Sequence, residues 1–137
     1  MVLALQDTLD MKDDSILKAS SGLAGGIGRM EDVCGALLGA SMMLGLQYGR
    51  GREELDDADK LASSTVPIGK LYKWFEKEFG TVKCKEVLTQ FGGGVYYDRK
   101  VKWQGELAKE AGLAQKCVVL TAKTAAKTAE MILDDTE

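Results

Sequence analysis

The sequence of 137 residues contains no histidine, and this absence restricts the chemistry that the chain can perform by itself. Histidine is the commonest general base and the commonest neutral metal ligand in proteins. Ser-His-Asp and Cys-His catalysis are therefore excluded within this chain. A metal site, if there is one, has to use thiolates, carboxylates or backbone oxygens.

Basic charge is also scarce. The 18 Lys and Arg residues are outnumbered by 21 Asp and Glu residues, which gives a net charge of −3. Nucleic-acid binders usually carry a basic excess, so we expect no nucleic-acid partner. The uncharged stretch that begins at Val33 ends before Arg50, short of the roughly 20 apolar residues that span a membrane. With no basic region before "VLAL" at the N-terminus, we expect neither a secretory signal nor a membrane partner.

Proline occurs once, which favours long helices, and apolar residues recur at helical spacing along most of the chain. The pattern predicts an all-α fold, a single helical domain over residues 1–137 with five to seven helices. Its centre is a buried helix at residues 32–48, which is apolar on nearly every side. Pro67 is expected to kink or split a later helix near Val66. Residues 95–103 fit either an extended segment or a helix start.

Two short helices are expected before the central one, at residues 2–9 and 14–24, with Asp13 or Asp14 as a cap. Between them and the central helix lies "GGIGRMEDVCGALLGA", residues 25–40. It lacks the Lys-Ser/Thr pair of a P-loop and the third glycine of a dinucleotide fingerprint. Acidic residues at a helix start also repel phosphate. The stretch therefore indicates a turn that delivers Cys34 to the central helix.

The three cysteines, Cys34, Cys84 and Cys117, contain no Cys-x-x-Cys pair. A single buried cysteine is most often a small hydrophobic residue. However, Cys34 and Cys84 each fall in the expected first turn of a helix, where amide dipoles favour the thiolate. Lys83, Lys85 and Lys116 neighbour the later two cysteines and act in the same direction, so these thiols are candidates for redox or metal chemistry.

The segment "GGIGRMEDVCGALLGASMMLGLQYG" resembles the signature of small redox-active proteins with a C…CGAxxG…C…C cysteine pattern. Here the central motif is residues 34–39, and the two later cysteines are Cys84 and Cys117. The resemblance implies a redox protein that holds an iron–sulfur cluster or another thiolate-bound metal. The family's first cysteine precedes an apolar stretch like "VLAL", and no cysteine stands there in this sequence. Either the sequence begins downstream of the native start, or this member has three thiolates and an open ligand position.

Three hypotheses of function follow. In the first, Cys34, Cys84 and Cys117 converge as redox or metal-binding residues at the start of the central helix. Glycines would then shape the site: Gly25, Gly26, Gly28, Gly35 and Gly39. In the second, Cys34 pairs with Cys84 or Cys117 in a metal-free thiol–disulfide switch. The third is a non-enzymatic helical interaction module. We expect a cytoplasmic protein with reduced thiols, a redox partner protein and a homodimer.

Overall fold

The computed structural model describes residues 1–135, and the all-α prediction is confirmed. Within these residues seven α-helices are joined by loops and two short 3₁₀ segments. The helices are α1 (Val2–Leu9), α2 (Asp14–Ser20), α3 (Gly35–Tyr48), α4 (Ala58–Phe79), α5 (Cys84–Phe91), α6 (Lys102–Glu110) and α7 (Leu113–Asp134). The 3₁₀ segments are η1 (Ser21–Leu23) and η2 (Arg52–Glu54).

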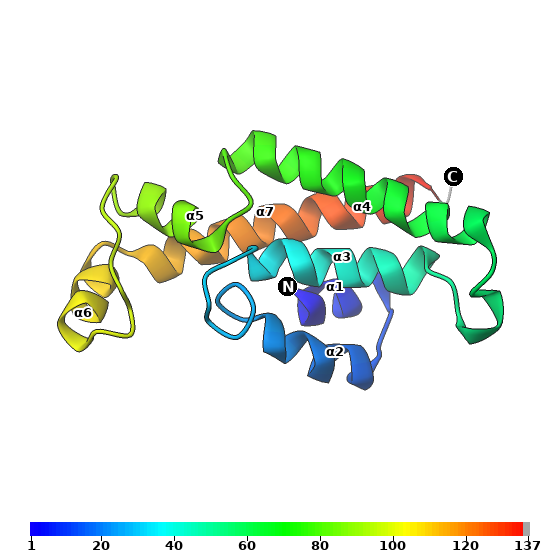
Figure 1. Cartoon of the computed structure of the whole chain (residues 1–137), viewed down its shortest axis with the longest axis horizontal. Coiled ribbons are helices and arrows are strands. Elements are labelled where there is room, and N and C mark those ends of the chain that lie inside the picture. Colours follow the sequence, from blue (N-terminus) through cyan, green and yellow to red (C-terminus); the bar gives the residue numbers. More distant parts are fainter. Residues whose placement is uncertain (136–137) are drawn as a thin grey trace.

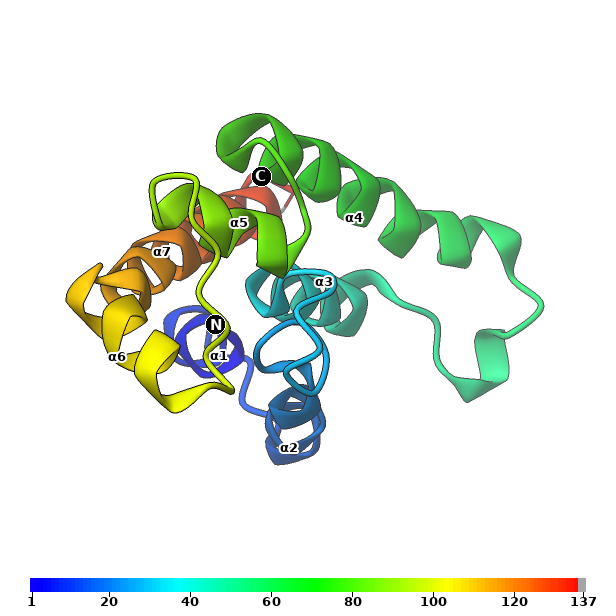
Figure 2. The same cartoon turned by 60° about the vertical axis from the view of Figure 1, so that its left-hand side comes forward.

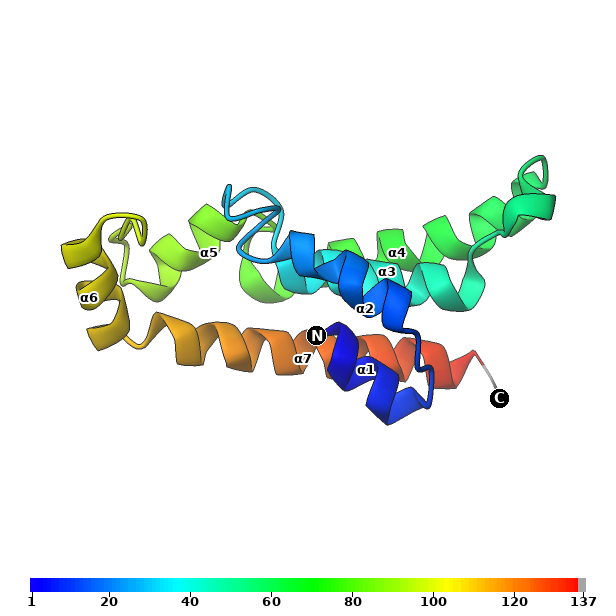
Figure 3. The ribbon, with the colours of Figure 1, turned by 90° about the horizontal axis from the view of Figure 1, so that it is seen from below.

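Helix α3 lies at the centre of the fold, as the sequence predicts. It contacts α1, α2, α4 and α7 (Figure 2). Its side chains Ala40, Met43 and Leu44 are fully buried, and α4 contributes Leu71 and Phe75 to the same interior. The long helices α3, α4 and α7 run side by side, and α5 and α6 lie together at one end of the elongated molecule (Figure 1). Viewed from below, α1 lies against α7 (Figure 3).

The central helix begins later than predicted, and its last turn is not fully buried. It starts at Gly35 instead of residue 32, with Cys34 as its N-cap. The reason is that the backbone of residues 31–34 pairs with residues 82–85 and so cannot be helical. Near its C-terminus Leu46 is 38% exposed, so the last turn has one side in solvent.

Proline 67 does not split its helix, so that part of the expectation is wrong. Helix α4 continues from Ala58 to Phe79 with Pro67 inside it. Proline removes the backbone donor that would pair with the carbonyl of Ser63. Since Ser63 is exposed, water can satisfy that carbonyl. The helix therefore loses one hydrogen bond on its solvent side without burying an unpaired group.

Local signals place most of the other helix ends. The Asp13 carboxylate accepts hydrogen bonds from the amides of Ser15 and Ile16, which starts α2 as predicted. That helix is shorter than expected, because residues 21–23 form a 3₁₀ turn. Gly80 ends α4 in a left-handed conformation, and Gly112 separates α6 from α7 in the same way. Within residues 1–135, no helix combines the length and the hydropathy that a membrane crossing requires.

The close approach of η1 to the start of α3 predicts opposite effects for two glycine substitutions in one helix. A Cβ on Gly35 would lie 2.5 Å from the backbone oxygen of Leu23, whereas a Cβ on Gly45 meets nothing within 4 Å. Gly35→Ala should lower the free energy of unfolding by about 1–3 kcal/mol through overpacking. Gly45→Ala should raise it by up to about 1 kcal/mol through helix propensity. Urea unfolding measures both, and equal effects would contradict this packing.

Candidate functional site

A short backbone pairing holds two of the three cysteines in place. Val33 and Lys83 form an isolated antiparallel bridge. The Cys34 amide donates to the carbonyl of Val82 at 2.8 Å, and the Cys84 amide donates to the carbonyl of Asp32 at 2.6 Å. Because side chains alternate along paired segments, Cys34 and Cys84 leave the bridge on the same side. Helix α3 begins directly after Cys34, and α5 begins at Cys84.

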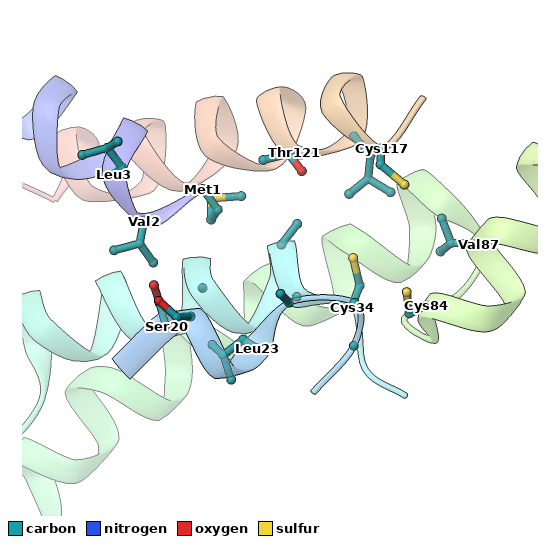
Figure 4. A pocket seen from close by; sticks show the side chains of 18 of the residues that line it. Met1, Val2, Leu3, Ser20, Leu23, Cys34, Cys84, Val87, Cys117 and Thr121 are labelled. Carbon is teal, nitrogen blue, oxygen red and sulfur yellow. The ribbon is translucent and has the colours of Figure 1, made fainter. Parts of the chain in front are cut away.

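All three cysteines line one cavity. The cavity has a volume of about 420 Å³ and lies between α1, η1, α3, α5 and α7. Figure 4 shows the Cys34 and Cys84 side chains side by side on one wall and Cys117 facing them from α7. Cys34 is 9% exposed, while Cys84 and Cys117 are half-buried. The structure thus brings together thiols that are separated by long stretches of sequence.

Four of the five glycines that the sequence singles out line this cavity: Gly25, Gly26, Gly35 and Gly39. A Cβ on Gly26 would lie 2.8 Å from the Cβ of Cys84, so the loop can approach this cysteine only with glycine at that position. At Gly39, a Cβ would lie 3.0 Å from the Cγ of Met1, which lines the same cavity. Gly28 does not line the cavity.

The loop that covers the cysteine end of the cavity has a strained backbone. Ile27, Arg29 and Glu31 all have positive φ angles, of 61°, 64° and 61°. Such a conformation costs a non-glycine residue roughly 1–2 kcal/mol. Backbone hydrogen bonds within the loop offset this cost, including those from Glu31 to Gly25 and from Asp32 to Gly26. The loop thereby fixes Glu31 and Asp32 immediately before Cys34.

Burial dominates the ionisation of the thiols, and it reverses the direction expected from the helix starts. Desolvation raises the pKa of Cys34, although the backbone amides of Ala36 and Leu37 act in the opposite direction. Burial and the neighbouring Cys34 raise the pKa of Cys84 to about 11. Burial also raises the pKa of Cys117. At Cys34 the helix-start amides act in the expected direction, but desolvation outweighs them, and burial is the largest cause of the raised pKa at all three thiols.

The three lysines that neighbour cysteines in the sequence are engaged elsewhere. Lys83 forms an ion pair with Asp32. Lys85 lies over the ring of Tyr96, 4.7 Å from its centroid. Lys116 donates to the carbonyl of Phe91 at 2.5 Å. Adjacency in sequence thus does not deliver these ammonium groups to the thiols.

The cationic side chain that lies near the thiols is that of Arg99, which the sequence pattern did not identify. Arg99 lines the cavity and lowers the pKa of both Cys84 and Cys117, partly offsetting burial. Its guanidinium forms an ion pair with Glu31 at 3.1 Å, and Glu31 also accepts a hydrogen bond from the Tyr96 hydroxyl. Arg99 lies in residues 95–103, whose structure the sequence pattern left undecided. No local signal in the sequence could place it against Cys84.

A thiolate-bound metal would require the cysteines to converge on one point. Structural metal sites need several ligands within about 2.0–2.3 Å of one ion. Within residues 1–135, no three His, Cys, Asp or Glu side chains are close enough together to hold a metal ion. As arranged, the described residues therefore form no site for a single metal ion. The iron–sulfur expectation stays a prediction.

Comparison with known proteins gives a match to a protein family. The model of a family described as "Putative redox-active protein (C_GCAxxG_C_C)" matches residues 1–131. This chain has three cysteines, and its residues 34–39 read Cys-Gly-Ala-Leu-Leu-Gly, with the glycine after the cysteine where the motif in the family's description has it before. No curated protein and no solved structure gives a significant match.

The raised pKa of Cys84 predicts how this thiol reacts with pH. In the variant Cys34→Ser/Cys117→Ser only Cys84 remains to be alkylated. Burial, the largest cause of the raised pKa, remains in this variant although the contributions of Cys34 and Cys117 are lost, so its alkylation rate should keep rising with pH beyond pH 9. The same variant in denaturant should level off near pH 9. A folded-state plateau at or below pH 9, measured with iodoacetamide, would contradict the burial of Cys84.

Proposed function

This chain belongs to the C_GCAxxG_C_C family of putative redox-active proteins, and we propose that its redox group is the dithiol–disulfide couple of Cys34 and Cys84. The observation that carries the proposal is the backbone pairing that fixes both residues beside one cavity, with their side chains on the same side. Cysteines can form a disulfide only when their Cα atoms lie within about 7 Å. Cys34 lies opposite Val82 and Cys84 lies opposite Asp32, so the two cysteines are diagonal neighbours across the pairing. Diagonal neighbours are about 7–8 Å apart, at the edge of that range.

The two thiols differ in access, which assigns their order of reaction. Cys84 is half-buried, and Arg99 acts to lower its pKa, whereas Cys34 is only 9% exposed. Cys84 is therefore the attacking thiol and Cys34 the resolving thiol. Cys117 faces this pair from the opposite wall and is not required for the couple (Figure 4).

The proposed reaction is thiol–disulfide exchange with a substrate disulfide. The Cys84 thiol loses its proton to solvent, and its sulfur attacks one substrate sulfur. The substrate S–S bond breaks, a mixed disulfide forms, and the first substrate thiolate leaves. Cys34 then attacks the Cys84 sulfur, which releases the second thiolate and leaves an intrachain disulfide. The substrate gains two electrons, which the dithiol loses, and a dithiol reductant restores the starting state.

Burial sets the direction in which this couple works. A dithiol becomes a strong oxidant when its reduced form is stabilised, as happens when one thiol has a low pKa. Here burial raises the pKa of both Cys34 and Cys84, so ionisation gives the reduced form no such stabilisation. The couple thus lacks the low-pKa thiolate that makes a dithiol a strong oxidant, which favours the direction in which it reduces other disulfides.

Three single substitutions test the pairing, because each leaves one pair of cysteines. With hydroxyethyl disulfide as oxidant, Cys117→Ser should lose two hydrogens in intact-mass analysis as fast as the unmodified protein. Cys34→Ser and Cys84→Ser should form an intrachain disulfide at least about tenfold more slowly, since their remaining thiols lie on opposite walls. Circular dichroism checks that each variant is folded. If Cys84→Ser oxidised as fast as Cys117→Ser, the proposed pair would be wrong.

A further inference from the structure

We propose that the substrate of this site is a small aliphatic disulfide that carries a carboxylate, bound in the cavity with its carboxylate toward Arg99. The inference rests on the proposed dithiol function and adds the class of substrate to it. Three properties of the cavity carry it: its size, its apolar wall and the position of its charged side chain.

The size and depth of the cavity favour a small molecule. A volume of about 420 Å³ lies within the range of roughly 300–1,000 Å³ typical of small-molecule sites. Cys34 is 9% exposed, and it lines this cavity together with residues of α1 and α7. A substrate disulfide has to reach Cys84 in this space, within range of Cys34. A disulfide fixed on the surface of a folded protein does not have that freedom.

Much of the cavity wall is apolar. Its apolar residues include Val2, Leu17, Leu23, Val87 and Leu120. The hydroxyls of Ser20 and Ser21 both donate to the carbonyl of Leu17, so they are occupied within the helix turn. Such a surface gains free energy by covering a substrate's methylene groups, at about 25 cal/mol per Å² of apolar area.

Arg99 gives the cavity its charge. Among the described residues that line it, Arg99 has the only charged side chain. Glu31 binds one terminal nitrogen of the guanidinium at 3.1 Å, and Glu31 itself does not line the cavity. The guanidinium has five N–H donors, and residues 1–135 supply it with no other hydrogen-bond acceptor. The carboxylate of Glu31 therefore orients Arg99, and the remaining donors suit a second carboxylate.

This placement also assigns a role in the exchange step. Arg99 lies close enough to influence the charge on both Cys84 and Cys117. A carboxylate bound to Arg99 would bring a disulfide a few bonds away to the Cys84 sulfur. The step is the exchange described above: the Cys84–S bond to substrate forms as the substrate S–S bond breaks. The leaving thiolate departs still attached to its own carboxylate, and Arg99 is a positioning residue.

A matched set of disulfides tests the charge preference. Dithiodipropionate is anionic, hydroxyethyl disulfide is neutral and cystamine is cationic, and all three have the same two-carbon arms. The reduced, full-length protein should react with dithiodipropionate about tenfold faster than with hydroxyethyl disulfide, and slowest with cystamine. Each rate is divided by the rate of the same probe with a small free thiol, because the three leaving thiolates differ in pKa. The ratio between probes then cancels any change in the nucleophilicity of Cys84. Added salt should reduce the ratio.

Arg99→Gln should bring the anionic-to-neutral ratio close to one, while Lys100→Gln should leave it unchanged. Lys100 is the matched control because it is an exposed neighbouring cation that does not line the cavity. A ratio near one in the unmodified protein, or a preference that survives Arg99→Gln, would overturn the substrate assignment while leaving the dithiol function intact. Failure of all three probes to produce the intrachain disulfide would overturn the dithiol function itself.

Discussion

The site depends on one short backbone pairing between segments fifty residues apart in the sequence, centred on Val33 and Lys83. The Cys34 amide donates to Val82 and the Cys84 amide donates to Asp32. Because these are backbone hydrogen bonds, they fix the positions of the two cysteines independently of their side chains. The same pairing stops α3 from starting earlier and determines where α5 begins. The strained loop before Cys34 is tolerated because this pairing and Glu31 hold its end in place.

Desolvation is the second constraint, and it decides the chemistry. Helix starts and nearby cations favour thiolates, yet the pKa values of all three cysteines are raised because burial outweighs both effects. Neutral thiols in an apolar cavity resist ionisation and deny the reduced state the stabilisation that makes a dithiol an oxidant. Arg99 moderates this effect at the thiol end of the cavity, where it offers a charge to a substrate.

The sequence predicted the all-α fold and the burial of the central helix, because apolar periodicity and caps such as Asp13 are local signals. The family resemblance pointed to the three cysteines, and they line one cavity. Two features were beyond the sequence. The lysines beside the cysteines were paired with Asp32, Tyr96 and a backbone carbonyl, and Arg99 reached the thiols through an irregular loop. Both depend on long-range packing, which periodicity and propensity do not encode.

The central claim is that burial makes Cys34 and Cys84 a reducing dithiol. The most direct measurement is the midpoint potential of the Cys117→Ser variant, equilibrated in dithiothreitol redox buffers and followed by counting free thiols. The account predicts a single two-electron transition at or below about −250 mV, toward the reducing end of the range of protein dithiols. A midpoint near about −150 mV, or no two-electron transition at all, would contradict it.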